Sequence, residues 1–378
     1  MFYYLYEYRD LFSPLRIFQY ITVRTFAAAA TAFGLSLLIG PSLIRTLFRL
    51  KIGQPIRGKD EMPLHEYHGA KAGTPTMGGL MMLASATVAT VLWAVPTNGF
   101  VWIALATFLF MGLVGFWDDY LKVARKKSKG LGARAKLILQ VGWAALLIII
   151  LFNWSETSVL ARQLMVPFLK EPVIADMGYV MATLFIAFVL VGSTNAVNLT
   201  DGLDGLAVGC FNASASAYLA MAYVAGHVVF ADYLNVPYIV PAGELAVFCG
   251  ALLGAGLGFL WFNCYPAKVF MGDTGSLALG GALAIVAILI NQELTLIIVG
   301  GVFVMEALSV VIQVFWFKRT GRRVFKCAPI HHHFEMIHKE QAESAGRPMG
   351  ISETTITIRF WILAIVFAIM GLATLKIR

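Results

Sequence analysis

The residues best suited to chemistry are five aspartates that stand beside long apolar stretches of the chain. Asp118 and Asp119 close one apolar run, and Asp273 precedes another. Asp201 and Asp204 lie in the Gly-rich stretch that follows a third run. Carboxylate oxygens are hard ligands that favour Mg²⁺ or Mn²⁺ over Zn²⁺. Because such an ion, together with Lys and Arg, neutralises a diphosphate, the pattern indicates metal-assisted pyrophosphate chemistry.

Each acidic segment also has an ordinary structural interpretation. A pair of aspartates at a helix end could be solvated, and Asp273 could be an N-cap. The Asn-x-x-Asp-Gly stretch that begins at Asn198 could be a turn with local Asx caps. The functional interpretation is favoured because all three acidic segments fall on the same predicted side of the membrane. The chain has no GxxxxGK[ST] pattern, so a P-loop ATPase is unsupported.

Three consecutive histidines, His331–His333, form a further polar motif. Consecutive residues on a helix point about 100° apart, so all three cannot readily chelate one metal ion. No Cys or His partner stands at zinc spacing. We therefore expect one or two of these imidazoles to donate a hydrogen bond to a phosphate or a sugar.

The elements that must position these residues are membrane helices. The 378 residues are 59% hydrophobic and 13% charged, with a mean hydropathy of +0.77, whereas soluble domains are ~45–50% apolar and ~25% charged. Apolar runs near 20 residues suit spanning helices and are too long for barrel strands. The sequence predicts an all-α integral membrane protein with a single polytopic domain over residues 1–378. About ten spans are expected, over residues 20–45, 77–95, 100–117, 137–152, 179–197, 206–225, 245–261, 277–290, 294–317 and 357–375.

The distribution of Lys and Arg predicts the orientation of these spans. The net charge of +8 comes from 29 Lys and Arg against 21 Asp and Glu. The cations gather in the loops after spans one, three, seven and nine and are sparse in the loops between them. The positive-inside rule places the basic loops, including Ser128 and Gly321, in the cytoplasm, and Thr97, Asn235 and both termini outside. Topology thus explains most of the positive charge, which removes the main support for nucleic-acid binding.

Six motifs are distributed along the chain from the first span to the last. They are Pro75–Gly79, Gly115–Tyr120, Asn195–Ala207, Gly258–Asn263, Phe270–Leu277 and Ala328–Glu335. Together and in this order they resemble the phospho-N-acetylmuramoyl-pentapeptide transferase family. The first and last motifs resemble this branch more than relatives that transfer N-acetylglucosamine phosphate.

The resemblance implies a ten-span α-helical fold in the bacterial inner membrane, with periplasmic termini, a cytoplasmic active-site cleft and a homodimeric state. It implies transfer of phospho-MurNAc-pentapeptide from UDP-MurNAc-pentapeptide to undecaprenyl phosphate, a carrier held among membrane lipids. The products would be lipid I and UMP, in a step of peptidoglycan synthesis that requires Mg²⁺.

The resemblance also implies roles for individual residues. Asp118, Asp119 and Asp273 match catalytic positions, and Asp273 matches the metal-binding one. Lys71 and Lys122 match lysines of the polar cleft. The nucleoside and phosphate pocket is matched by Asn198, Asp201, Gly202, Asp204, Asn263 and Phe270, of which Phe270 is suited to stack on uracil. The far side of the cleft is matched by Gln313, His331, His332 and His333.

Other functions and a second mechanism stay open at this point. A transporter would place its acids near the bilayer midplane, whereas these acids gather at one end of the spans. A sibling transferase would use UDP-GlcNAc, and a structural scaffold would need the spans but not the acids. Within the transferase, the acceptor phosphate could attack the donor directly, or an Asp carboxylate could first form a covalent phospho-sugar enzyme.

Overall fold

The computed structural model describes residues 1–50, 73–124, 130–344 and 350–377, which are almost wholly helical. The long helices are α1 (Ile21–Arg49), α3 (Gly79–Trp93), α4 (Gly99–Ala124), α5 (Ala133–Asn153), α6 (Gly178–Thr200), α7 (Leu206–Ala225), α9 (Leu245–Asn263), α10 (Gly272–Leu289), α12 (Gly301–Thr320), α13 (Ile330–Ser344) and α14 (Gly350–Ala373). The short elements are α8 (Val228–Leu234), α11 (Thr295–Val299) and the 3₁₀ turns η1 (Phe2–Asp10), η2 (Ser13–Gln19), η4 (Leu160–Arg162) and η5 (Val240–Glu244).

The predicted spans are all helical, which confirms the all-α membrane fold. Nine helical stretches in the described ranges are long and apolar enough to cross a membrane, and α3 is a shorter apolar helix of 15 residues. The prediction of one unbroken span over 294–317 was wrong, because the helix is interrupted at Gly300, between α11 and α12. Glycine weakens a helix interior. At Gly301 the missing side chain also makes room for Phe367 of α14, which would lie 2.7 Å from an added Cβ.

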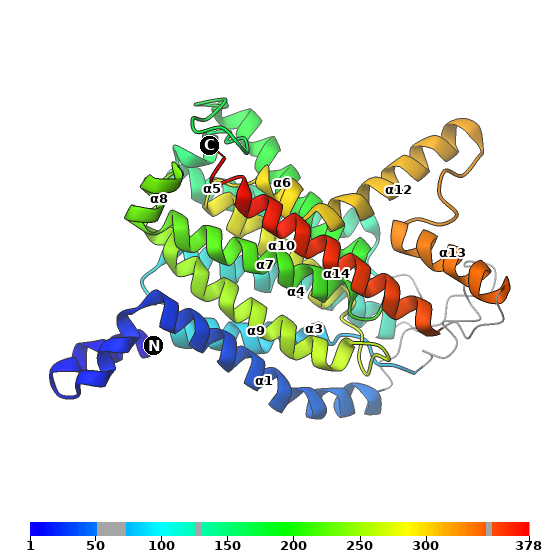
Figure 1. Ribbon diagram of the computed structural model, residues 1–378, viewed down its shortest axis with the longest axis horizontal. Coiled ribbons are helices and arrows are strands. Elements are labelled where there is room, and N and C mark those ends of the chain that lie inside the picture. Colours follow the sequence, from blue (N-terminus) through cyan, green and yellow to red (C-terminus); the bar gives the residue numbers. More distant parts are fainter. Residues whose placement is uncertain (51–72, 125–129, 345–349, 378) are drawn as a thin grey trace.

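The buried helix α10 lies in the middle of the bundle, packed against α3, α4, α6 and α7 (Figure 1). Two glycines let their helices approach its first turn. A Cβ on Gly115 of α4 would lie 2.1 Å from the backbone oxygen of Asp273, and a Cβ on Gly79 of α3 would lie 2.2 Å from Gly275 N. Small residues are the usual means by which membrane helices pack closely. They bring the start of α10 against the last turns of α4.

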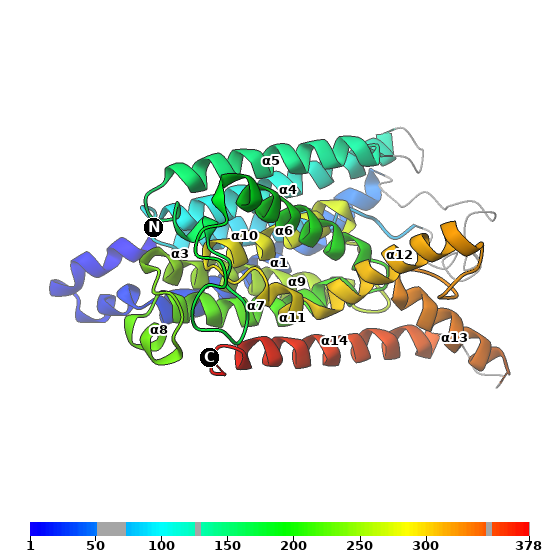
Figure 2. The same ribbon diagram turned by 90° about the horizontal axis from the view of Figure 1, so that it is seen from above.

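The two ends of the bundle differ in what they carry. Both termini lie at one end, and α13 with the adjoining ends of α12 and α14 lies at the other (Figures 1 and 2). From the bundle α12 extends outward, and the chain then returns through α13 to contact α14. The common end of the termini agrees with the predicted even number of spans. Which side of the membrane they occupy stays a prediction.

Candidate active site

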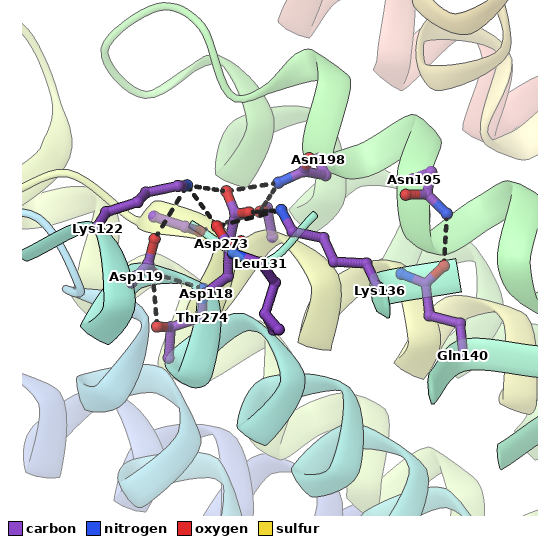
Figure 3. A network of polar contacts seen from close by, with 12 residues as sticks. Asp118, Asp119, Lys122, Leu131, Lys136, Gln140, Asn195, Asn198, Asp273 and Thr274 are labelled. Atoms are coloured by element: carbon purple, nitrogen blue, oxygen red, sulfur yellow. Dashed lines mark hydrogen bonds and ion pairs between the residues drawn. The ribbon is translucent and has the colours of Figure 1, made fainter. Parts of the chain in front are cut away.

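Three aspartates meet where the last turns of α4 reach the first turn of α10. Asp118 and Asp119 come from α4, and Asp273 comes from α10. One carboxylate oxygen from each residue lies within 4.8 Å of the others (Figure 3). The two α4 residues are buried and Asp273 is half-buried. Carboxylates this close repel one another, so the cluster needs compensating positive charge.

Two lysines supply that charge. Lys122 Nζ lies 2.6 Å from Asp118 Oδ2 and 3.4 Å from Asp273 Oδ1. Lys136, in the first turn of α5, places its Nζ 3.1 Å from Asp118 Oδ2 and forms a closer ion pair with Asp273. The other Asp118 oxygen accepts a hydrogen bond of 2.7 Å from the Leu131 backbone N–H. Asp118 is therefore held on both oxygens, with one of them between two ammonium groups.

Asp119 fastens the start of α10 to α4. Its Oδ2 accepts hydrogen bonds from Thr274 N, at 2.9 Å, and from Thr274 Oγ1, at 2.7 Å. The backbone bond satisfies an N–H in the first turn, which has no partner within its own helix. Gly272 has a φ of +72°, and a Cβ there would lie 2.5 Å from Asp119 Oδ2. Glycine fits here because it adopts positive φ freely and leaves room for the carboxylate.

Polar contacts also join α5 and α6 to the cluster. Asn198 of α6 donates a hydrogen bond of 3.1 Å to Asp273 Oδ1. One turn earlier, Asn195 donates a bond of 2.8 Å to Gln140 Oε1 of α5 (Figure 3). Four helices, α4, α5, α6 and α10, thus contribute side chains to one polar network.

The turn after α6 brings Asp201 and Gly202 beside this network. Burial, followed by the negative charges of Asp273 and Asp119, raises the pKa of Asp201 to about 8. The Gly272 backbone N–H opposes this rise only in part. Asp201 therefore keeps its proton far above the usual range of an aspartate.

Two residues expected in the nucleoside pocket also hold loops in place. Asp204 and Asn263 are both buried. Asp204 Oδ2 accepts a hydrogen bond of 3.0 Å from Ala267 N, and Asn263 Oδ1 accepts one of 3.1 Å from Gly205 N. These bonds join the turn after α6 to the loop before α10, in which the half-buried Phe270 lies.

The histidine motif opens α13 and reaches the same turn. The buried His331 places its Nδ1 3.0 Å from Glu306 Oε2 of α12. A Cβ on Gly202 would lie only 2.2 Å from His331 Nε2, so this imidazole is next to the turn after α6. His332, also buried, places its Nδ1 2.9 Å from Glu335 Oε2.

The remaining two predicted residues of this region organise the loop between α12 and α13. His333 Nδ1 accepts a hydrogen bond of 3.1 Å from Lys326 N. Gln313 Oε1 accepts bonds of 3.1 and 2.9 Å from Val324 N and Phe325 N. In the described part of the chain their hydrogen bonds go to this loop and not to the aspartates. Lys71, the second predicted cleft lysine, lies outside the described residues, as does Ser128, which is predicted to be cytoplasmic.

Comparison with known proteins places this site in a family. The model of glycosyl transferase family 4 matches residues 101–291, which include the three aspartates. The chain is 50% identical to the phospho-N-acetylmuramoyl-pentapeptide-transferase of Methylacidiphilum infernorum (isolate V4), with 100% of each chain covered. It is also 50% identical to the protein of that name from Desulfotalea psychrophila, with 100% of each covered. The relative of the same name from Koribacter versatilis is 48% identical over 97% of this chain and 96% of its own. The chain belongs to the phospho-N-acetylmuramoyl-pentapeptide-transferase family.

Membership in this transferase family confirms the enzyme class that the six motifs predict. It also agrees with the position of the acids, which lie at the ends of α4 and α10 and not at mid-helix as a transporter would require. The histidine motif follows residue 291 and so lies beyond the match to glycosyl transferase family 4.

Two residues near the site, Lys136 and Glu306, were not predicted from the sequence. Lys136 is one of many cations in a basic loop, and its contact with two aspartates depends on how α5 packs against α4. Glu306 gives a clearer signal, because it is the one acid within the apolar stretch 294–317. A carboxylate at membrane depth is a functional candidate by default.

The donor set of the cluster suits a hard divalent cation. Asp118, Asp119 and Asp273 offer carboxylate oxygens, the ligands that Mg²⁺ prefers. One Asp119 oxygen is already engaged by Thr274, whereas Asp273 is the most exposed of the three. Asp273 is therefore the carboxylate of the three that is most open to a ligand, although its oxygens also contact Lys122, Lys136 and Asn198.

Proposed function

We propose that this chain transfers phospho-N-acetylmuramoyl-pentapeptide from UDP-MurNAc-pentapeptide to undecaprenyl phosphate, giving lipid I and UMP. The observation that carries the proposal is the cluster of three aspartates and two lysines at one end of a membrane-spanning bundle. Such a cluster suits a reaction between a water-soluble diphosphate and a phosphate anchored in lipid. Family membership supports the same reaction, and the location proposed is the cytoplasmic face of the bacterial inner membrane.

The proposed cofactor is Mg²⁺, held by Asp273 with help from Asp118 or Asp119. When bound, it would neutralise charge on the donor diphosphate. Asp273 lies in the first turn of α10 and is the most exposed of the three carboxylates, so it is the one that an ion or a phosphate can approach most readily. Asn198 orients this carboxylate through the 3.1 Å hydrogen bond.

The protein's own side chains position the reactants and balance their charge. Asp118 is proposed to orient the acceptor phosphate or to take its proton, since it ends a membrane helix at the depth expected for that headgroup. Lys122 and Lys136 lie where they can bind phosphate oxygens as well as carboxylates. An acceptor oxygen then bonds to the donor's β-phosphorus as the bond to UMP breaks. One pyrophosphate replaces another, so positioning and electrostatics carry most of the catalysis.

The proposed reaction is tested by incubating the purified protein with UDP-MurNAc-pentapeptide, undecaprenyl phosphate and Mg²⁺. We expect UMP release and a lipid-linked sugar product. UDP-GlcNAc is the matched alternative donor. If it is the better substrate, the muramoyl assignment is wrong, and if neither donor reacts, the transferase proposal fails. Homodimer formation, proposed on the family resemblance, is tested by light scattering of the detergent-solubilised protein.

Two variants separate the proposed roles of the acids. Asp273→Asn and Asp118→Asn should each lower turnover by ~10²-fold or more. The rate of Asp273→Asn should respond less to added Mg²⁺, whereas Asp118→Asn should stay slow at saturating Mg²⁺. Incubation with donor alone then tests direct displacement. Stoichiometric UMP release without acceptor, together with a phospho-sugar trapped on an aspartate, would show a covalent intermediate instead.

A further inference from the structure

Glu306 is a carboxylate placed where a membrane protein has strong reason to avoid one. It lies in the apolar helix α12 and is fully buried. A buried carboxylate is costly unless hydrogen-bonded groups or charges compensate it. Among the described residues, the hydrogen-bond partner of its carboxylate is His331 of α13, through Oε2, and Oε1 has none. Oε2 lies 3.0 Å from His331 Nδ1 and 3.5 Å from the His331 backbone N–H.

The opposite side of the His331 ring faces the turn after α6. Although His331 is fully buried, its Nε2 has no hydrogen-bond partner in the described part of the chain. That nitrogen points at Gly202, where an added Cβ would lie 2.2 Å away. A buried and unpaired polar atom beside a polar network indicates a position that a ligand completes.

The contact with Glu306 determines what this nitrogen can do. An ionised carboxylate only accepts hydrogen bonds, so beside ionised Glu306 the ring proton stands on Nδ1. In the neutral imidazole Nε2 is then an acceptor. For His331 this differs from the expectation that one or two of the three imidazoles donate to a phosphate or a sugar. The same logic orients metal-binding and catalytic histidines in other proteins, where a carboxylate fixes the tautomer and the ring angle.

We propose that Glu306 is a positioning residue, which holds His331 so that Nε2 accepts a hydrogen bond from an N–H or O–H group of the sugar nucleotide beside Gly202. The inference rests on the proposed function and adds to it a residue that contacts no substrate. Under this proposal Glu306 affects donor binding, measured by Kd and KM, more than the turnover number kcat. Losing Glu306 should weaken donor binding through His331 alone.

A double-mutant cycle tests this coupling. Glu306→Leu keeps side-chain volume and removes the acceptor, whereas Glu306→Gln keeps a carbonyl oxygen that can accept from Nδ1. The readouts are the Kd for UDP-MurNAc-pentapeptide by calorimetry and the separate values of KM and kcat. We expect Glu306→Leu to raise Kd and KM about tenfold, as loss of one buried hydrogen bond implies. Glu306→Gln should stay within about threefold of the wild type.

The His331→Ala background decides the outcome. There, Glu306→Leu should have no further effect on Kd, because its influence passes through the imidazole. The proposal would be overturned if the increases in Kd from Glu306→Leu and His331→Ala multiplied in the double variant. It would also be overturned if Glu306→Gln bound the donor as weakly as Glu306→Leu. If the wild-type protein itself fails to release UMP from donor and acceptor, the proposed function fails. An active wild type with independent losses refutes only the role of Glu306.

A second variant keeps the test decisive if Glu306→Leu does not fold. Gly202→Ala places a methyl group against Nε2 and should raise Kd by a similar factor in the wild type, but not in the His331→Ala background. Gly192→Ala, on α6 with nothing within 4 Å of the added Cβ, is the matched control and should leave Kd unchanged. Equal effects of Gly202→Ala with and without His331 would contradict the proposed contact.

Discussion

Replacing Gly115 by alanine tests whether the close approach of α4 and α10 determines the geometry of the aspartates. The added Cβ would lie 2.1 Å from the backbone oxygen of Asp273, whereas ordinary contacts begin at 3.4 Å. Backbone cannot rotate away as a side chain can, so the two helices must separate by roughly an ångström. Overpacking of this kind destabilises by about 1–3 kcal/mol. Since Asp273 moves with the backbone, the rate of UMP release should fall even in protein that stays folded.

The expected loss in kcat/KM is on the order of 10²-fold, the effect of misplacing a catalytic group by about 1 Å. The assay is UMP release, with thermal unfolding measured on the same preparation. Gly112→Ala is the matched control on the same helix, because its Cβ would meet the end of the Leu83 side chain at 2.6 Å. That side chain can rotate, so activity should stay within about threefold. Equal activity of the two variants would refute the reasoning.

Three further predictions concern pH, charge and topology. Burial lowers the pKa of His332 in spite of Glu335, so below pH ~6.5 the unfolded chain binds a proton that the folded chain excludes. The contribution of His332 to stability should therefore fall by up to ~1.4 kcal/mol per pH unit. It is measured as the difference in thermal unfolding between the wild type and His332→Asn from pH 7.5 to 5.5, because the opposite effect of Asp201, whose pKa is raised, is common to both proteins. Lys136→Met should reduce UMP release ~10-fold or more without unfolding the protein, because Asp118 and Asp273 lose an ammonium group; wild-type turnover would show that Lys122 suffices. In a background without native cysteines, an impermeant thiol reagent should label Asn235→Cys in intact cells but Thr320→Cys only after permeabilisation, and the reverse pattern would invert the topology.

The fold was predictable because its strongest determinant, the length of apolar runs, is written directly in the sequence. All ten predicted spans are helical, and the acids stand at the ends of helices as expected. The break at Gly300 was missed because hydropathy does not change there, and only the Gly-Gly pair hints at it. Local patterns determine helices, and they say little about where a helix is interrupted.

The candidate site was predictable in part. Asp118, Asp119 and Asp273 were linked by motif and by their shared side of the membrane, and the structure brings them within 4.8 Å of one another. The contribution of Lys136 could not be predicted, since it depends on the packing of α5 against α4. The buried pair of Glu306 and His331 likewise depends on how α13 folds back onto α12. Contacts between segments that are distant in the sequence cannot be predicted from the local spacing of residues.

The enclosure of α10 has a consequence for how the enzyme responds to its membrane. In its most apolar stretch 89% of the residues are buried, against 28% in each of α5 and α12. Changes in bilayer thickness act through lipid-facing helices, which tilt or shift to relieve hydrophobic mismatch. The helix that carries Asp273 has almost no lipid contact through which such a force could act. Altered bilayer thickness should therefore displace Lys136, on the lipid-facing α5, more than Asp273 on the enclosed α10, so that the membrane acts on the cluster mainly through its lysine.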